Sequence, residues 1–99
     1  MAQKISREEE AKIPQFHSHE EAKAWFEDRY GEDFILTGTE YLGQEQEKCY
    51  FYYLILDWKE YMKGLKEVRI NHNMAAGLDF LYSHQPVQIM ENGSIHIVH

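Results

Sequence analysis

The six histidines are the residues of this chain best suited to bind a metal or to transfer a proton near neutral pH. Four of them form two close pairs, His17 with His19 and His96 with His99. The other two, His72 and His84, stand alone. A zinc site needs three or four ligands that converge on one point, and none of these spacings resembles a zinc motif. We therefore expect no metal and no other cofactor, and we interpret the histidines as exposed or turn residues.

Nucleophilic chemistry has little support in the sequence. Cys49 is the only cysteine, and its apolar neighbours predict a buried, unreactive thiol with a raised pKa. The chain has no Gly-x-Ser-x-Gly elbow and no glycine-rich phosphate loop. Adjacent acidic pairs such as Glu20 and Glu21 point apart and are expected to be solvated. No catalytic motif is present, which favours a function without catalysis but leaves open a site assembled from distant residues.

Four basic residues form a strip on a predicted helix. Placed at 100° per residue, they fall within an arc of about 120°. The strip is either an ordinary solvated helix face or a docking strip for an acidic partner or a phosphate group. Its members are Lys59, Lys63, Lys66 and Arg69.

Aromatic residues form a second candidate surface. The run 50–53 reads Tyr-Phe-Tyr-Tyr, so in a strand two of these side chains point to each face. If helices cover one face only, the other carries exposed tyrosines, which are common at binding surfaces. If helices cover both faces, the aromatics belong to the core. The candidate interaction surface therefore consists of Tyr50, Tyr52, Tyr53 and His96 together with the basic strip.

Composition limits the classes of protein to which the chain can belong. Its 99 residues are 43% hydrophobic, enough for one folded domain. Residues 1–47 hold 12 acidic and 5 basic residues and residues 48–99 hold 5 of each, so the net charge of −7 arises in the first half. This charge disfavours nucleic acid and anionic lipid as partners. A single cysteine, no signal-peptide pattern and no apolar run of about 20 residues predict a soluble, cytoplasmic protein.

The periodicity of apolar residues predicts seven elements after a polar leader. Ser18 and Glu21 form a capping box at the start of the first helix, and Gly31 follows its end. Asp57 and Glu60 form a second capping box. The leader, residues 1–12, is either disordered or folded into a short helical turn. The predicted helices span residues 18–30, 58–67 and 74–82. The predicted strands span residues 33–42, 48–56, 87–90 and 94–98. Residues 68–70 could extend the second helix or begin an extended segment, and residues 84–86 are expected to end the third helix.

The register of the last hairpin follows from its apolar pattern. A two-residue turn at Asn92 and Gly93 would pair Ile89 with His96 and mix polar and apolar residues on one face. A three-residue loop with Gly93 in the left-handed conformation pairs Ile89 with Ile95 and residue 87 with residue 97. This register collects the branched residues on one face, and we prefer it for that reason.

These elements predict an α+β fold: an antiparallel sheet of about four strands in two hairpins, with two to three helices packed mainly on one face. Residues 13–99 form the single domain. We expect a protein-interaction or regulatory module that binds a protein partner or a second copy of itself. The alternative is a small-molecule-binding protein or minor enzyme with a pocket between helices and sheet. An enclosed pocket with converging polar groups would favour the alternative, and a flat exposed aromatic patch or a strand-edge dimer would favour the interaction module.

Overall fold

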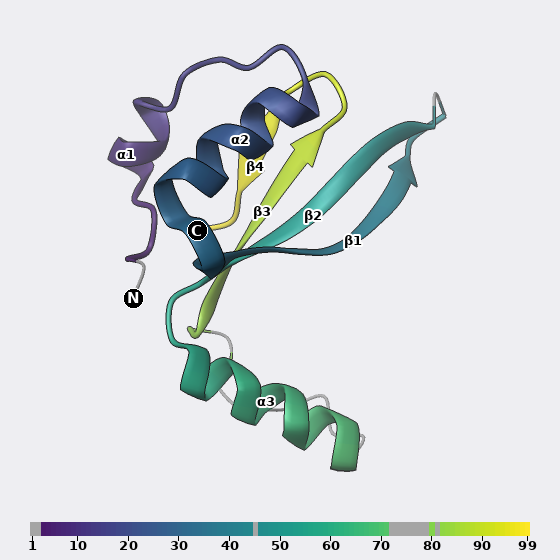
Figure 1. Ribbon diagram of the computed structural model, residues 1–99. Coiled ribbons are helices and arrows are strands. Elements are labelled where there is room, and N and C mark those ends of the chain that lie inside the picture. Colours follow the sequence, from purple (N-terminus) through teal and green to yellow (C-terminus); the bar gives the residue numbers. More distant parts are fainter. Residues whose placement is uncertain (1–2, 45, 72–79, 81) are drawn as a thin grey trace.

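A computed structural model describes residues 3–44, 46–71, 80 and 82–99 (Figure 1). One four-stranded antiparallel sheet has the strand order β1-β2-β3-β4, and the predicted α+β fold is confirmed. The elements are α1 (Arg7–Ala11), α2 (His19–Tyr30), the short 3-10 helix η1 (Gly31–Asp33), β1 (Phe34–Leu42), β2 (Glu47–Ile55), α3 (Trp58–Asn71), β3 (His84–Met90) and β4 (Ile95–Ile97).

Helix α2 lies across one face of the sheet (Figure 1). It begins as its sequence predicts, because the Ser18 hydroxyl accepts a hydrogen bond of 3.1 Å from the Glu21 backbone N–H. Ala22 and Phe26 are fully buried on its inner side. The Phe26 ring stacks on that of Phe34 in β1, with centroids 4.9 Å apart. The apolar stripe of α2 therefore anchors the core of the domain.

The leader folds onto the same side of the sheet as α2. Ile5 is 1% exposed, and its backbone exchanges two hydrogen bonds, of 2.7 and 3.0 Å, with the side-chain amide of Gln85 in β3. Ser6 then caps α1 through the backbone N–H of Glu9. Of the two alternatives for the leader, the structure shows the helical turn, and Ile5 belongs to the core.

The C-terminal hairpin has the predicted register. Val87 pairs with Ile97 and Ile89 with Ile95, and Gly93 has a φ of +92°. The start of this hairpin differs from the prediction, because β3 begins at His84 and not at residue 87. Residues 84–86 pair with β2 instead of ending a helix, and the Pro86 carbonyl accepts a hydrogen bond of 3.0 Å from the Val98 N–H.

The N-terminal hairpin contains a β-bulge. The pairing of β1 with β2 shifts between Leu36 and Gly38, so that Thr37 is the extra residue. The Thr37 hydroxyl donates to the Phe51 carbonyl over 3.0 Å. Beyond the bulge, the two strands extend past α2 (Figure 1).

Helix α3 packs at one end of the sheet (Figure 1). It begins after Asp57, which accepts the predicted capping hydrogen bond of 3.2 Å from the Glu60 N–H. It continues through residues 68–70 to Asn71, so these residues extend the helix and do not begin a strand, the alternative that the sequence left open. The Trp58 indole N–H donates to Asp33 over 2.7 Å and ties the helix to η1. Apart from residues 80 and 82, the predicted helix 74–82 lies outside the described residues.

A buried histidine joins α3 to the sheet and makes the stability depend on pH. His84 is 9% exposed and contacts the rings of Tyr53, Tyr61 and Phe80, with centroids 4.3, 5.3 and 4.9 Å away. Burial lowers the pKa of His84, although a hydrogen bond to the Phe80 backbone opposes the shift. The unfolded chain therefore binds the proton more readily. The contribution of neutral His84 to the free energy of unfolding is fully present above the ordinary histidine pKa of about 6.5. This contribution is lost as the pH falls from that value through the lowered pKa of the folded state.

We expect the His84→Gln variant to lose less of its unfolding free energy than the wild type between about pH 7 and pH 5. Urea unfolding at the two pH values measures this difference. His17→Gln is the matched control, because His17 is exposed. An identical acid dependence in wild type and His84→Gln would show that His84 does not carry the effect.

Candidate functional site: the open face of the sheet

The two faces of the sheet have different surroundings. The leader and α2 cover one face, and α3 reaches the other at its end, where Tyr61 packs against Tyr53 and His84. No described helix covers the remaining rows of this second face. One row of side chains on this face crosses all four strands. It runs from Gly38 to Phe51, Gln88 and His96, each of which pairs with the next. We call this surface the open face and define it as Gly38, Phe51, Tyr53, Pro86, Gln88, His96 and Val98.

The open face is a shallow depression and not an enclosed pocket. Its volume is about 540 Å³. Half-buried Phe51, Tyr53 and Pro86 form its floor, Gln88 adds a hydrogen-bonding amide, and Val98 is 39% exposed at its rim. Its other lining residues are Thr37, Gly38, Thr39 and Glu40 of β1. Such a surface fits a broad, mixed apolar and polar contact better than a small ligand.

The structure divides the tyrosines of the predicted surface between the two faces. Tyr53 and His96 lie on the open face. Tyr52 is 2% exposed beneath α2, so its assignment to an exposed surface is wrong. Tyr50 is half-buried on the same side as Tyr52, under the ring of His19 at a centroid distance of 3.4 Å. Alternate residues of a strand point to opposite faces, and only one face receives α2.

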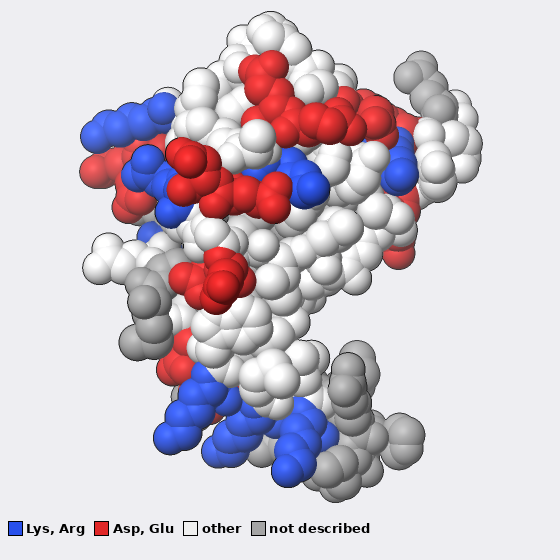
Figure 2. All heavy atoms as spheres, in the orientation of Figure 1, with Lys and Arg blue, Asp and Glu red and all other residues white. Residues whose placement is uncertain are grey.

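The basic strip lies on α3, at one end of the sheet. Lys59, Lys63 and Lys66 are exposed on α3, and of Arg69 only the helical backbone is described. Figure 2, viewed from the side of α2, shows basic side chains gathered over α3 and acidic side chains over the upper part of the molecule. Lys59, Lys63 and Lys66 do not line the depression on the open face, so the structure does not bring them together with the aromatic residues there.

A buried polar pair was missed from the sequence. His19 is 6% exposed, and its Nε2 lies 2.7 Å from the Tyr52 hydroxyl. Its Nδ1 lies 3.7 Å from a carboxylate oxygen of Glu20. A carboxylate, an imidazole and a hydroxyl in this order resemble the arrangement used in nucleophilic catalysis.

The environment of this pair argues against catalysis. Tyr52 is 2% exposed, and burial, assisted by nearby Glu27, raises its pKa to about 12. The hydroxyl is therefore protonated at neutral pH and out of reach of a substrate. The hydrogen bond between His19 and Tyr52 instead fixes the first turn of α2 on β2. Sequence periodicity could not reveal it, because His19 reads as a polar residue at a helix start.

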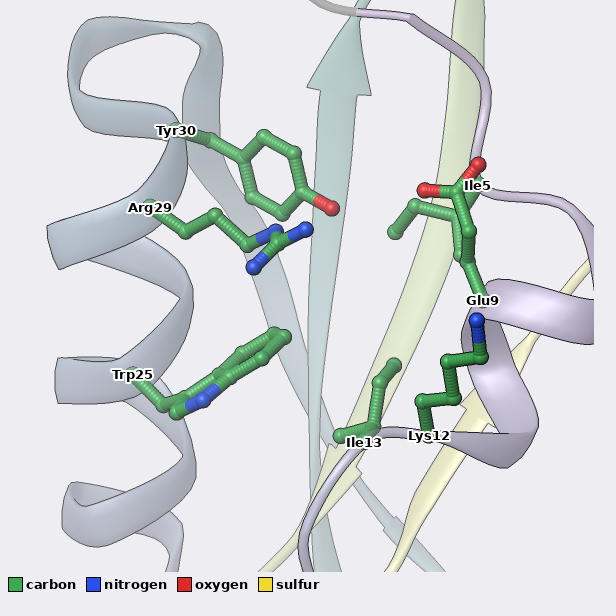
Figure 3. A pocket seen from close by; sticks show the side chains of 7 residues that line it. All are labelled: Ile5, Glu9, Lys12, Ile13, Trp25, Arg29 and Tyr30. Carbon is green, nitrogen blue, oxygen red and sulfur yellow. The ribbon is translucent and has the colours of Figure 1, made fainter.

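A small cavity lies between the leader and α2 (Figure 3). Figure 3 shows Trp25, Arg29 and Tyr30 of α2 on one side of it. The Arg29 guanidinium carbon lies 5.4 Å from the Trp25 ring centroid. The cavity measures about 80 Å³, whereas ligand pockets usually measure about 300–1,000 Å³. It is a packing seam and not a ligand site; Ile5, Glu9, Lys12 and Ile13 complete its lining.

Metal ligands do not gather in the described part of the chain. Among residues 3–44, 46–71, 80 and 82–99, no group of three or more His, Cys, Asp or Glu side chains could hold an ion. Cys49 is fully buried in β2, and burial, followed by the charges of Glu40 and Glu47, raises its pKa. Within the same residues, no helix combines the length and the apolar character that crossing a bilayer requires.

Comparison with protein-family models, with curated proteins and with solved structures gave no significant match to this chain. A functional assignment therefore depends on the geometry of the molecule itself.

Proposed function

We propose that this protein is a non-catalytic interaction module that binds a protein partner through the open face. One observation supports the proposal above all others. The face presents aromatic and apolar side chains, and no described helix covers its central rows. Exposed apolar patches on small soluble proteins commonly mark contact sites.

The side chains of the open face indicate the chemistry of the partner. Phe51, Pro86 and Val98 favour apolar side chains, and Gln88 can hydrogen-bond to a polar group between them. Glu40 is the one charged residue in the lining. The expected partner surface is therefore apolar at its centre, with a basic residue opposite Glu40. The net charge of −7 also favours a partner that is not strongly acidic.

The small-molecule alternative has less support. The cavity beside α2 is too small for most ligands, and the depression on the open face is broad and shallow. The His19–Tyr52 pair is buried in the core. The single buried cysteine is compatible with a cytoplasmic location, which we include in the proposal.

Site-specific photo-cross-linking in cells that naturally produce the protein tests this function. A photoreactive residue replaces Gln88 on the open face or, as the matched control, Lys23 on the exposed side of α2. We expect position 88 to yield a discrete adduct with another protein, identified by mass spectrometry, and position 23 to yield none. Adding Phe51→Glu should abolish the adduct, because the charge faces the apolar centre of the contact.

Two results would contradict the proposal. One is the absence of any adduct from position 88 in cells that contain the folded protein. The other is the same set of adducts from positions 88 and 23, which would indicate random collisions.

A further inference from the structure

Strand β1 forms a long edge of the sheet. It has nine residues and pairs with β2 on one side, and its other side faces no described strand (Figure 1). All of its residues from Leu36 onward are exposed. Natural edge strands are usually protected by charged residues, especially lysine, by proline, by β-bulges or by being short. The opposite edge, β4, has three residues, whereas β1 contains neither lysine nor proline.

The bulge at Thr37 arranges the apolar side chains of this edge in two sets. Leu36 pairs with Tyr52, and Tyr41 pairs with Lys48. Residues 48 and 52 of β2 lie an even number of positions apart, so Leu36 and Tyr41 share the α2 side of the sheet. Ile35 and Leu42, by the same pairing, share the opposite side. Leu36 is 53% exposed, Tyr41 61% and Leu42 40%.

We propose that β1 pairs antiparallel with β1 of a second copy of this chain, across a two-fold axis at Thr39, with Thr37 of each copy remaining the extra residue of its bulge. This pairing places Leu36 opposite Tyr41 of the second copy, and Ile35 opposite its Leu42. Each member of these pairs then lies on the same side of the joined sheet as its neighbour. The edge is thus complementary to itself, as a two-fold interface requires.

The charges of β1 permit this pairing. Glu40 is the only charged residue of the strand, and in this register it lies opposite Gly38 of the second copy. Like charges therefore do not meet, and the free N–H and C=O groups on both sides of the bulge gain partners. The open faces of both copies lie on the same side of the joined sheet and remain uncovered. The pairing uses the backbone edge of β1, whereas the proposed function uses side chains on the face of the sheet, so either proposal can fail alone even though residues 37–40 border both surfaces.

Sedimentation over a range of concentrations tests the pairing. We expect the wild type to sediment at twice the chain mass of 11.8 kDa. Leu36→Lys should halve that mass, because it brings a charge into the apolar pair. Met62→Lys is the matched control: Met62 is 56% exposed on α3, so a similarly exposed apolar residue is changed away from the edge. The control should leave the mass unchanged.

Disulfide trapping tests the register. A chain with Leu36→Cys is mixed with a chain with Tyr41→Cys under mild oxidation, and we expect a covalent dimer of the two. Neither variant alone should form it, because residue 36 lies far from its own copy in this register. A monomeric wild type at the highest soluble concentration would overturn the proposal, as would a Leu36→Lys variant that remains dimeric. Cross-linking by either variant alone would overturn the register.

Discussion

Phe26→Ala is expected to lower the unfolding free energy by about 3–5 kcal/mol, the usual cost of removing a buried aromatic ring. Phe26 is fully buried at the centre of an aromatic cluster. Its ring lies 4.9 Å from the ring of Phe34 and 4.9 Å from that of Trp25, measured between centroids. The substitution removes these contacts and leaves a cavity between α2 and the sheet. A domain of this size has a total stability of about 5–15 kcal/mol, so a large part of it would be lost.

Urea unfolding, followed by far-ultraviolet circular dichroism, measures the change. Phe51→Ala is the matched control, because it removes the same atoms from a half-buried position on the open face. We expect it to cost less than half as much as Phe26→Ala. Equal losses from the two variants would mean that the open face is as well packed as the core, and would also weaken the proposed interaction surface.

The parts of the fold that were predicted correctly depend on local signals. The cap at Ser18 and the cap at Asp57 each need one side chain and a backbone N–H three residues further on. The register of the last hairpin follows from which positions are branched and from the position of Gly93. Each signal lies within a few residues of the feature that it determines, so a single sequence is sufficient to find it.

The missed parts depend on contacts between residues far apart in the chain. Ile5 looks like an isolated apolar residue in a charged leader, and it becomes a core residue because Gln85, 80 positions away, satisfies its backbone. Residues 84–86 contain a proline and read as the end of a helix. They form a strand because Tyr53, Leu54 and Ile55 of β2 pair with them. Local propensity carries no information about either partner.

The candidate surface likewise depends in part on a local signal and in part on a contact between distant residues. Alternation along β2 predicts that Tyr50 and Tyr52 share one face and that Tyr53 lies on the other, which the pairing confirms. The sequence does not say which of the two faces receives a helix. Helix α2 settles on the Tyr52 side, where His19 pairs with the tyrosine hydroxyl. The open face is therefore a consequence of where α2 docks and not of the aromatic run alone.

Gly93→Ala is expected to destabilise the domain by about 2–5 kcal/mol, from two causes that act together. The φ of +92° costs an L-residue about 1–2 kcal/mol. In addition, a Cβ atom at this position would lie 2.6 Å from the Phe16 carbonyl carbon and oxygen and 2.8 Å from the Ser18 nitrogen. These are backbone atoms that lead into α2 and cannot give way alone, so overpacking adds about 1–3 kcal/mol.

Gly43→Ala separates the two causes. Gly43 also has a positive φ, of +75°, but a Cβ atom there would meet nothing within 4 Å. It should therefore show the backbone cost alone, about 1–2 kcal/mol. Urea unfolding of both variants gives the difference, which measures the contact between the last hairpin and the start of α2. Hydrogen exchange at Glu21 should rise in Gly93→Ala, because the cap at Ser18 is displaced, and remain unchanged in Gly43→Ala. Equal destabilisation of the two variants, with Glu21 equally protected, would show that the hairpin does not position α2.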